Sequence, residues 1–436
     1  MSIKETSINY NAESLAMSAK HKGRLSYSSA FGNINNKYEL AIAYTPGVAE
    51  PCREIAKDTD ASYIYTGRGN LVAVITDGSA VLGLGDIGGL SGMPVMEGKS
   101  ALMIEFAGVN SMPLCIKVDM QNSKYEKDSA EYVEEYSDKF CDIVKALEGS
   151  WGAINLEDIK RPYCFDIEKK LKEICEIPVF HDDQHGTAIV VRSALLNASR
   201  VAGKKFEEMR VVISGSGAAG NSVCKLLLAS GIKDIIMVDR NGTLSKHDNS
   251  LPTDHKELAE LTGYDKANLP LQEALVGADI FIGLSAPNIL KKEWIKNMAD
   301  KSIICAMANP IPEIMPDDAI AGGAYIIATG RSDFPNQVNN VMAFPGIFKG
   351  ALAVRASDIT EGMKIAASNA IADSVENPSV EQIMPDAFDK TVALKVAVAV
   401  AEEAVRSGSS RISPQDAELA INNLKNELEK LSKAKS

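Results

Sequence analysis

The chain has 436 residues, of which 45% are hydrophobic and 24% charged, as in an ordinary globular protein. At this length we expect about two domains. The net charge of −12 argues against nucleic-acid binding, although a local site can still hold a small anion. No stretch has the roughly 18 uninterrupted apolar residues of a membrane span. The start lacks the apolar core of a signal peptide, and the seven cysteines form no C-x-x-C pair, so we expect a cytoplasmic protein with free thiols.

Nine short apolar runs alternate with helical segments and predict parallel strands. After a helical N-terminal segment, the runs lie at 71–78, 113–119, 153–159, 177–183, 210–217, 234–242, 279–285, 302–310 and 324–332. Such alternation is typical of right-handed βαβ units, whose parallel sheets are covered by helices. We therefore predict an α/β fold with two domains, a parallel-sheet domain for substrate and metal and a Rossmann-type domain for a dinucleotide, with helical segments at both ends of the chain.

The same pattern predicts where the domains lie. A helical run between Ile189 and Gly203 separates the first four strands from the last five, so we expect an N-terminal domain over 1–185 and a dinucleotide-binding domain over 186–345. From about residue 346 the pattern is mostly helical. Residues 346–436 are expected to pack back on the core and to end in a solvated helix.

Two acidic pairs each close a predicted strand. Glu157-Asp158 follows the run 153–156, and Asp182-Asp183 follows the apolar part of the next run, at 177–180. Ligands collect at the carboxyl ends of parallel strands, and charges placed there need compensation. Mg²⁺ or Mn²⁺, which prefer oxygen ligands, would supply it. On spacing alone the acids could equally cap the following helices or face solvent.

A G-x-G-x-x-G motif opens the predicted second domain. The residues expected to contact a dinucleotide there are Gly215, Gly217, Ala218, Ala219 and Gly220. The glycines allow a tight turn, close approach of a pyrophosphate and close helix–strand packing, and the helix N-terminus favours the phosphates. Asp239 ends the next strand, 24 residues past the first glycine, near the spacing at which an acid binds the adenosine ribose. The alternative is a glycine turn that serves packing only.

The choice between NAD and NADP stays open on these residues. Asp239 favours NAD, because a carboxylate repels a 2′-phosphate. The adjacent Arg240, or Lys246 further on, could instead hold that phosphate, and Arg240 could also be a solvated surface charge. The balance slightly favours NAD.

Asparagines follow two of the later predicted strands. Asn309 stands in the run ANP, and Asn340 lies in the run after 324–332. Such side chains could hydrogen-bond a nicotinamide ribose or a substrate carboxylate, although asparagine before proline is also ordinary turn chemistry.

With these motifs in view, the chain resembles the malic enzymes, in particular the shorter bacterial-type form. The similarity runs from about residue 20 to about residue 405. It is carried by AYTPGVAEPC, GLGDIGGLSGMPVMEGKS, NLEDI, FHDDQHGTA, the glycine loop, ANPIPE and GRSDFPNQVNNVMAFPGIF. The resemblance implies a decarboxylating, NAD(P)-dependent malate dehydrogenase, which oxidises L-malate, decarboxylates the resulting oxaloacetate to pyruvate and uses Mg²⁺ or Mn²⁺.

The resemblance also implies residue roles. The expected metal ligands are Glu157, Asp158 and Asp183, the expected catalytic residues are Tyr44, Lys99 and Asp182, and the expected malate contacts are Asn309 and Asn340, with Asn309 also near the cofactor. Lys99, with its pKa lowered by burial and a nearby cation, would take the proton of the C2 hydroxyl. Tyr44 would protonate the enolpyruvate at carbon. Without the resemblance, Lys99 would be interpreted as a surface charge or helix-start residue, and Tyr44 as a buried ring beside a helix that starts at Thr45-Pro46.

Three further expectations concern the surroundings of the site. His181 and His185 should support the site rather than ligate metal, because imidazole suits zinc or copper. Ala80 stands where the longer eukaryotic branch has a substrate-binding arginine, so amides, another residue or a neighbouring subunit would hold the second malate carboxylate. The resemblance implies a homodimer in which the N-terminal segment, Tyr44 included, completes the partner's site.

Two rival functions are compatible with the sequence. A non-oxidative enzyme on the same fold could decarboxylate malate to lactate with tightly bound NAD, or act chiefly on oxaloacetate. A catalytically silent dinucleotide-binding regulator would need only the glycine loop, and the presence of Lys99, Tyr44 and the carboxylates argues against it.

Overall fold

Two sheets organise the chain in the computed structural model, which describes residues 9–81 and 83–435. Residues 1–8, 82 and 436, which belong to the predicted domains, lie outside the described residues. The strands are β1 (Leu71–Thr76), β2 (Asn110–Cys115), β3 (Ala153–Leu156), β4 (Val179–His181), β5 (Arg210–Ser214), β6 (Asp234–Asp239), β7 (Gly242–Thr243), β8 (Ile280–Gly283), β9 (Ile303–Ala306) and β10 (Ile326–Thr329). They form one sheet in the order β2-β1-β3-β4 and a second in the order β10-β9-β8-β5-β6-β7. The predicted α/β fold is confirmed.

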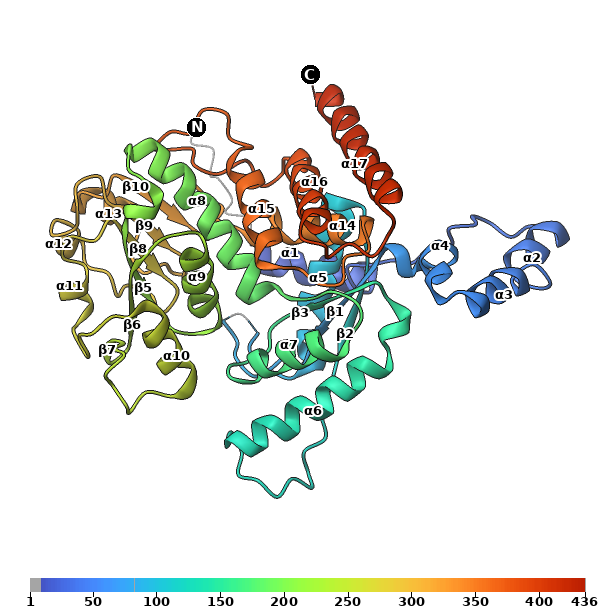
Figure 1. The fold of residues 1–436 in the computed structure, drawn as a ribbon, viewed down its shortest axis with the longest axis horizontal. Coiled ribbons are helices and arrows are strands. Elements are labelled where there is room, and N and C mark those ends of the chain that lie inside the picture. The colour runs from blue at the N-terminus through green and yellow to red at the C-terminus, as the bar shows by residue number, and fades with distance from the viewer. Residues whose placement is uncertain (1–8, 82, 436) are drawn as a thin grey trace, which may run out of the picture.

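The helices are α1 (Tyr10–His21), α2 (Lys37–Ala43), α3 (Ala49–Lys57), α4 (Ser62–Tyr65), α5 (Gly89–Ala107), α6 (Ala130–Ala146), α7 (Tyr163–Ile174), α8 (Thr187–Ala202), α9 (Ala218–Ala229), α10 (Thr253–Thr262), α11 (Leu271–Ala274), α12 (Lys292–Ile295), α13 (Pro316–Gly322), α14 (Phe344–Ala353), α15 (Glu361–Ala372), α16 (Lys390–Arg406) and α17 (Pro414–Lys435). Short turns η1 (Thr59–Ala61), η2 (Gly67–Asn70), η3 (Glu148–Ser150), η4 (Asp182–Gly186), η5 (Phe206–Glu208) and η6 (Asn340–Met342) join them. Figure 1 shows the two sheets side by side, with α8 running between them.

The apolar residues of β1 divide between the two faces of the first sheet, because successive side chains of a strand point in opposite directions. Val72 and Val74 belong to the core that contains Met96 of α5. Ala73 and Ile75 belong to the core formed with α6 and α7. Burial on both faces explains why this strand is a continuous apolar run in the sequence.

All nine predicted strands are present, and the positions at which they end differ from the prediction for a common reason. Most end before their predicted ranges do, because the last residues of each run enter the loops at the carboxyl edge of the sheet. β2 begins earlier than predicted, at Asn110. β7 was not predicted: it is a two-residue antiparallel addition in which Thr243 pairs with Val238 of β6.

The C-terminal helices pack across the middle of the molecule. Helix α14 contacts α5 and α16, and α15 contacts α8, so the C-terminal segment touches elements on both sides of the predicted boundary. Helix α17 packs on α16 and then extends away from the body (Figure 1). The domain limits near residues 185 and 345 stay a prediction.

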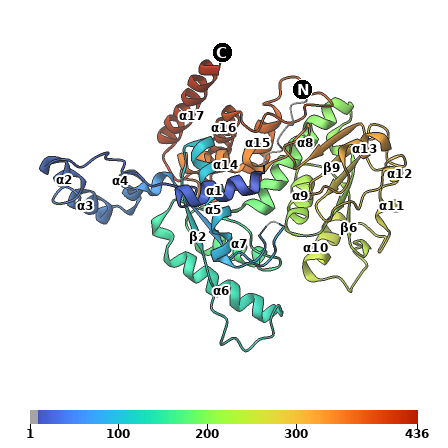
Figure 2. The same cartoon turned by 180° about the vertical axis from the view of Figure 1, so that it is seen from behind.

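Residues 27–66, which we call the N-terminal arm, project from the body with α2, α3 and α4 (Figures 1 and 2). Within it α3 contacts α4 and η1. The ring of Tyr63 at its base lies between Arg68 and Arg355, whose guanidinium carbons are 4.4 Å and 4.3 Å from the ring centroid. Across the described ranges, no helix combines the length and apolar character needed to cross a membrane.

Candidate active site and cofactor pocket

Lys99 lies at the centre of a buried charged cluster between α5 and the carboxyl edge of the first sheet. Its ammonium group donates to Asp182 and lies 3.1 Å from Glu157 Oε1. Asn340 donates to the same Asp182 oxygen, and Asn155 Nδ2 donates to Glu157 Oε1 at 2.8 Å. The Asp182 side chain is fully buried and that of Lys99 is 14% exposed. The cluster thus joins two predicted catalytic residues, a predicted metal ligand and a predicted substrate contact.

The charges of this cluster do not balance. Burial raises the pKa of Glu157 and Asp182 above their usual range. Burial, followed by the charge of Asp183, raises the pKa of Asp158 to about 7. Burial alone would lower the pKa of Lys99, but the carboxylates of Asp182 and Glu157 outweigh it and raise that pKa. While these two carboxylates face the ammonium group, the pKa of Lys99 is raised and not lowered as expected.

The predicted metal ligands lie in neighbouring turns but do not converge. The backbone N–H of Asp158 donates to Asp183 Oδ2 at 2.7 Å, and Glu157 is engaged by Lys99. In the described part of the chain, no three histidine, cysteine, aspartate or glutamate side chains are placed to hold a metal ion. The donor chemistry nevertheless fits a hard divalent cation, since Asp158 Oδ2 and Asp182 Oδ1 are buried without a hydrogen-bond partner among the described atoms. The carboxylates would have to turn toward a common point to bind one.

The turn η4, which carries Asp182 and Asp183, is anchored by the second histidine of the motif. His185 Nε2 lies 2.8 Å from Glu168 of α7, and its Nδ1 lies 3.1 Å from the ammonium nitrogen of Lys364 of α15. Because an ammonium group only donates, Nδ1 accepts and the proton sits on Nε2. This arrangement agrees with a supporting role for His185. His181 is buried, with Nδ1 3.9 Å from Asp183 Oδ2.

A cavity of about 920 Å³ lies at the carboxyl edge of the second sheet, where the predicted glycine motif follows β5. Gly215 has φ +114°, and a Cβ there would lie 2.5 Å from Leu284 O. A Cβ on Gly220 would lie 1.8 Å from Gly215 O, so the helix α9 can approach the turn only with glycine at this position. The cavity opens between the ends of β5 and β8, which is the topological switch point where such sheets bind ligands.

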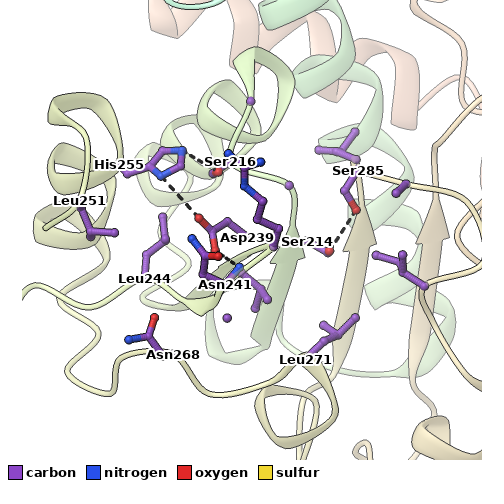
Figure 3. Close-up of a pocket in the computed structure, with 18 of the residues that line it drawn as sticks. Ser214, Ser216, Asp239, Asn241, Leu244, Leu251, His255, Asn268, Leu271 and Ser285 are labelled. Carbon is purple, nitrogen blue, oxygen red and sulfur yellow. Dashed lines mark hydrogen bonds and ion pairs between the residues drawn. The ribbon is translucent and has the colours of Figure 1, made fainter. Parts of the chain in front are cut away.

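Asp239, at the end of β6, faces into this cavity (Figure 3). Its Oδ1 accepts the backbone N–H of Asn241 at 2.7 Å. Arg240 also lines the cavity, whereas Lys246, which the sequence offered as a second phosphate ligand, is exposed and is not among the lining residues.

Arg161 reaches the cofactor cavity from the other sheet. It follows the Glu157-Asp158 pair in the loop after β3, and its guanidinium makes a bidentate ion pair with Asp254 in the first turn of α10. A bidentate arginine–carboxylate pair fixes geometry as well as charge. The loop that carries two predicted metal ligands is therefore tied directly to the wall of the dinucleotide cavity.

Two predicted site residues stand apart from the Lys99 cluster. Asn309 is exposed after β9, and its side-chain amide fills the space beside Gly330. Tyr44 is 66% exposed on the N-terminal arm, and α3 begins at Ala49 rather than at Thr45-Pro46. The interpretation of Tyr44 as a buried ring beside that helix is wrong for this chain, because the arm has no layer packed over it.

The sequence interpretation missed several groups that shape the site. Asn155, Arg161 and His255 were not singled out. Asn155 donates to Glu157 two residues further on, whereas Arg161 and His255 contact segments far away in the chain. Glu313 was missed as well: it is buried, and its carboxylate accepts the backbone N–H groups of Ala308 and Ser285 at 3.0 Å and 2.9 Å. The glutamate that ends the run ANPIPE, after Pro-Ile-Pro, was the one available signal.

The fold and the two sites define a two-domain α/β enzyme that binds a dinucleotide. Family models match on both sides of the predicted boundary, "Malic enzyme, N-terminal domain" over residues 23–172 and "Malic enzyme, NAD binding domain" over residues 184–405. The chain belongs to the malic enzyme family.

Individual relatives agree with this assignment. The chain is 46% identical to a bifunctional malic/malolactic enzyme of Bacillus subtilis, covering 94% of this chain and 96% of the relative. It is 46% identical to an NADP-dependent malic enzyme of Halomonas elongata, covering 86% and 88%. A crystal structure of an NAD-dependent malic enzyme from Thermotoga maritima superposes with a TM-score of 0.80 at 47% identity, covering 88% of this chain and 98% of that one.

Proposed function

We propose that this chain oxidises L-malate with NAD⁺ or NADP⁺ and decarboxylates the resulting oxaloacetate to pyruvate. The observation that carries the proposal is the buried Lys99 cluster, which places an amine, two carboxylates and an amide at one sheet edge. Arg161 links this edge to the dinucleotide cavity. A reaction that moves a hydride from a substrate to a nicotinamide needs the two sites next to each other.

In the proposed reaction Lys99 accepts the proton of the malate C2 hydroxyl while the C2 hydride passes to the nicotinamide. A divalent cation held by Glu157, Asp158 and Asp183 would polarise the C2 oxygen and stabilise the negative charge that develops as CO₂ leaves. The carboxylates of Asp182, Glu157 and Asp183 raise the pKa of Lys99, so a cation that engaged Glu157 and Asp183 would weaken two of the interactions that hold its proton. Loss of CO₂ leaves an enolate, and Tyr44 donates a proton to its C3 carbon to give pyruvate.

The test is reduction of the cofactor, followed at 340 nm with L-malate and Mn²⁺, with NAD⁺ and NADP⁺ supplied in parallel. We expect metal-dependent reduction that matches the pyruvate assayed at the end, and the faster nucleotide names the cofactor. If neither nucleotide is reduced while malate disappears, the oxidative reaction is excluded. A silent regulator would bind nucleotide and leave malate unchanged.

A second candidate is non-oxidative decarboxylation of malate to lactate. The Bacillus subtilis relative, named a bifunctional malic/malolactic enzyme, matches nearly the whole chain and is the observation that favours this second reaction. The same assay separates the two, because a malolactic reaction yields lactate and CO₂ without net reduction of free NAD⁺.

Metal binding by the carboxylates can be measured without turnover. We expect Mn²⁺ to raise the melting temperature in a concentration-dependent way, because a ligand that binds only the folded state stabilises it by mass action. Asp158→Asn should weaken the shift strongly, since its Oδ2 is a buried oxygen without a partner among the described atoms. Asp248→Asn, which changes a carboxylate of the dinucleotide cavity, is the matched control and should keep the shift. An unchanged shift in Asp158→Asn would remove Asp158 from the proposed ligand set.

The N-terminal arm supports a homodimer. Its large apolar side chains are unusually exposed, with Tyr38 at 75% and Ile64 at 74%, and exposed apolar patches on this scale mark interaction surfaces. Tyr44 directly follows α2 on the same arm, and α2 projects away from α5, the helix that carries Lys99 of the same chain (Figures 1 and 2). We infer that two copies exchange arms and that Tyr44 serves the partner's site. A cytoplasmic location stays a prediction.

A further inference from the structure

His255 of α10 lies on the wall of the dinucleotide cavity and connects two parts of it. Its Nε2 lies 2.8 Å from the hydroxyl of Ser216, the residue between the first two glycines of the motif. Its Nδ1 points toward Asp239, as Figure 3 shows, at 3.8 Å from Oδ2. One imidazole therefore touches the glycine loop with one nitrogen and faces the expected ribose-binding acid with the other.

The gap between His255 and Asp239 is too long for a direct hydrogen bond. Only 8% of the His255 side chain is exposed, and its Nδ1 is buried without a hydrogen-bond partner among the described atoms. Asp239 Oδ1 is already engaged by the backbone of Asn241, which leaves Oδ2 for this gap. A buried polar atom aimed into a cavity without a partner is costly unless a ligand satisfies it.

A hydroxyl group fits this gap, because it donates one hydrogen bond and accepts others. An oxygen about 2.8 Å from both atoms would accept from Nδ1–H and donate to the Asp239 carboxylate. A phosphate ester lacks the proton to donate and would be repelled by the carboxylate. The hydroxyl of Ser216 is compatible with the tautomer that this requires, since it can donate to Nε2 and leave the proton on Nδ1.

We propose that His255 binds the 2′-hydroxyl of the adenosine ribose together with Asp239, and that this pair makes NAD⁺ the preferred cofactor. This inference rests on the proposed function, which places the cofactor in this cavity. It adds a residue that selects NAD⁺ over NADP⁺. Burial, followed by the charge of Arg161, lowers the pKa of His255, so its ring is neutral and offers no cation to a 2′-phosphate.

The arrangement of α10 keeps His255 in place. The preceding residue, Asp254, holds the bidentate ion pair with Arg161, so the first turn of the helix is fixed from the other side of the cavity. Arg240 is exposed and lines the cavity next to Asp239 in the chain, so a 2′-phosphate held by Arg240 would lie near the Asp239 carboxylate.

The test compares ligands rather than rates. Isothermal titration calorimetry of the whole chain with ADP and 2′-deoxy-ADP should show about thirtyfold weaker binding of the deoxy ligand, because it lacks one hydrogen bond to the charged Asp239 and one to the neutral His255. NADP⁺ should bind more weakly than NAD⁺. Equal affinity for ADP and 2′-deoxy-ADP, or tighter binding of NADP⁺, would overturn the proposal without any variant.

A variant then isolates the histidine. In His255→Phe, which keeps a ring but no nitrogen, ADP should bind more weakly and its advantage over 2′-deoxy-ADP should shrink to about tenfold, since only the bond to the charged Asp239 remains. His247→Phe, an exposed histidine of the same domain, is the matched control and should retain the wild-type ratio.

A purely structural role predicts a different pattern. If His255 only supports the glycine loop through Ser216, then His255→Phe and Ser216→Ala should weaken both ligands equally and leave the ratio unchanged, which would refute the proposal. Failure of the proposed function is distinguishable, because the ligand ratio needs no malate turnover. A protein that binds ADP more tightly than 2′-deoxy-ADP but does not oxidise malate would refute only the proposed function.

Discussion

Lys99→Met is expected to lower kcat for malate oxidation by a factor of about 10³ or more, within the range known for a positioned acid–base group. Methionine keeps much of the length of the side chain and removes the only cation that contacts Asp182 and Glu157 among the described residues. The measurement is steady-state reduction of the nucleotide at saturating malate and Mn²⁺. Binding of ADP should be unchanged, since Lys99 does not line the dinucleotide cavity.

The same variant should also lose stability in the absence of metal. Removing one partner of a buried ion pair leaves an uncompensated charge, which costs about 3–5 kcal/mol. Mn²⁺ should recover part of this loss by engaging the carboxylates. Lys205→Met, which changes a lysine whose side chain is 75% exposed, should retain both activity and stability. Near-normal turnover in Lys99→Met would remove Lys99 from the chemistry.

Mixing two inactive variants, Tyr44→Phe and Lys99→Met, is expected to restore activity if the arm completes the partner's site. In a mixed dimer, one site then combines an intact Tyr44 with an intact Lys99. With random assortment at equal amounts, half of the dimers are mixed and each has one working site, so about a quarter of wild-type activity should return. The measurement is cofactor reduction after the subunits have been allowed to exchange.

The controls decide how the result is interpreted. Each variant incubated alone must stay inactive, and size-exclusion chromatography must show dimers that exchange subunits. Tyr38→Phe, a tyrosine on the same arm, should stay active. Exchange without any recovered activity would place both residues of each site in one chain, and the arm would then have to fold back toward Lys99.

The fold was predictable because it depends on local patterns. The runs that became β1, β3 and β5 are apolar on both faces, and a strand buried on both sides leaves that mark in the sequence. The glycine motif predicted α9 as well, since its spacing is a requirement of the turn itself. β7 was not predictable, because two residues that pair with the end of β6 carry no period.

The candidate site was predictable only in part. Carboxylates at strand ends can be expected to meet, because parallel strands share an edge, and Asp182 and Glu157 do lie together around Lys99. The position of Tyr44 was not available from its motif, since a sequence does not say whether a segment packs on its own body or on another copy. The partnership of His255 with Asp239 depends on how α10 docks, which no spacing along the chain reveals.

The ion pair between Arg161 and Asp254 would couple a nucleotide to the metal ion that we propose. Arg161 lies three residues after Asp158, so the loop that would hold the ion and the helix that lines the nucleotide cavity move as neighbours. If the ion binds one position of that loop more tightly than another, the ion pair shifts α10 along with the loop. Coupling between two binding equilibria is reciprocal. An ion that tightens nucleotide binding by some factor is itself held tighter by the same factor once the nucleotide is present, which makes the ion and the nucleotide cooperative partners.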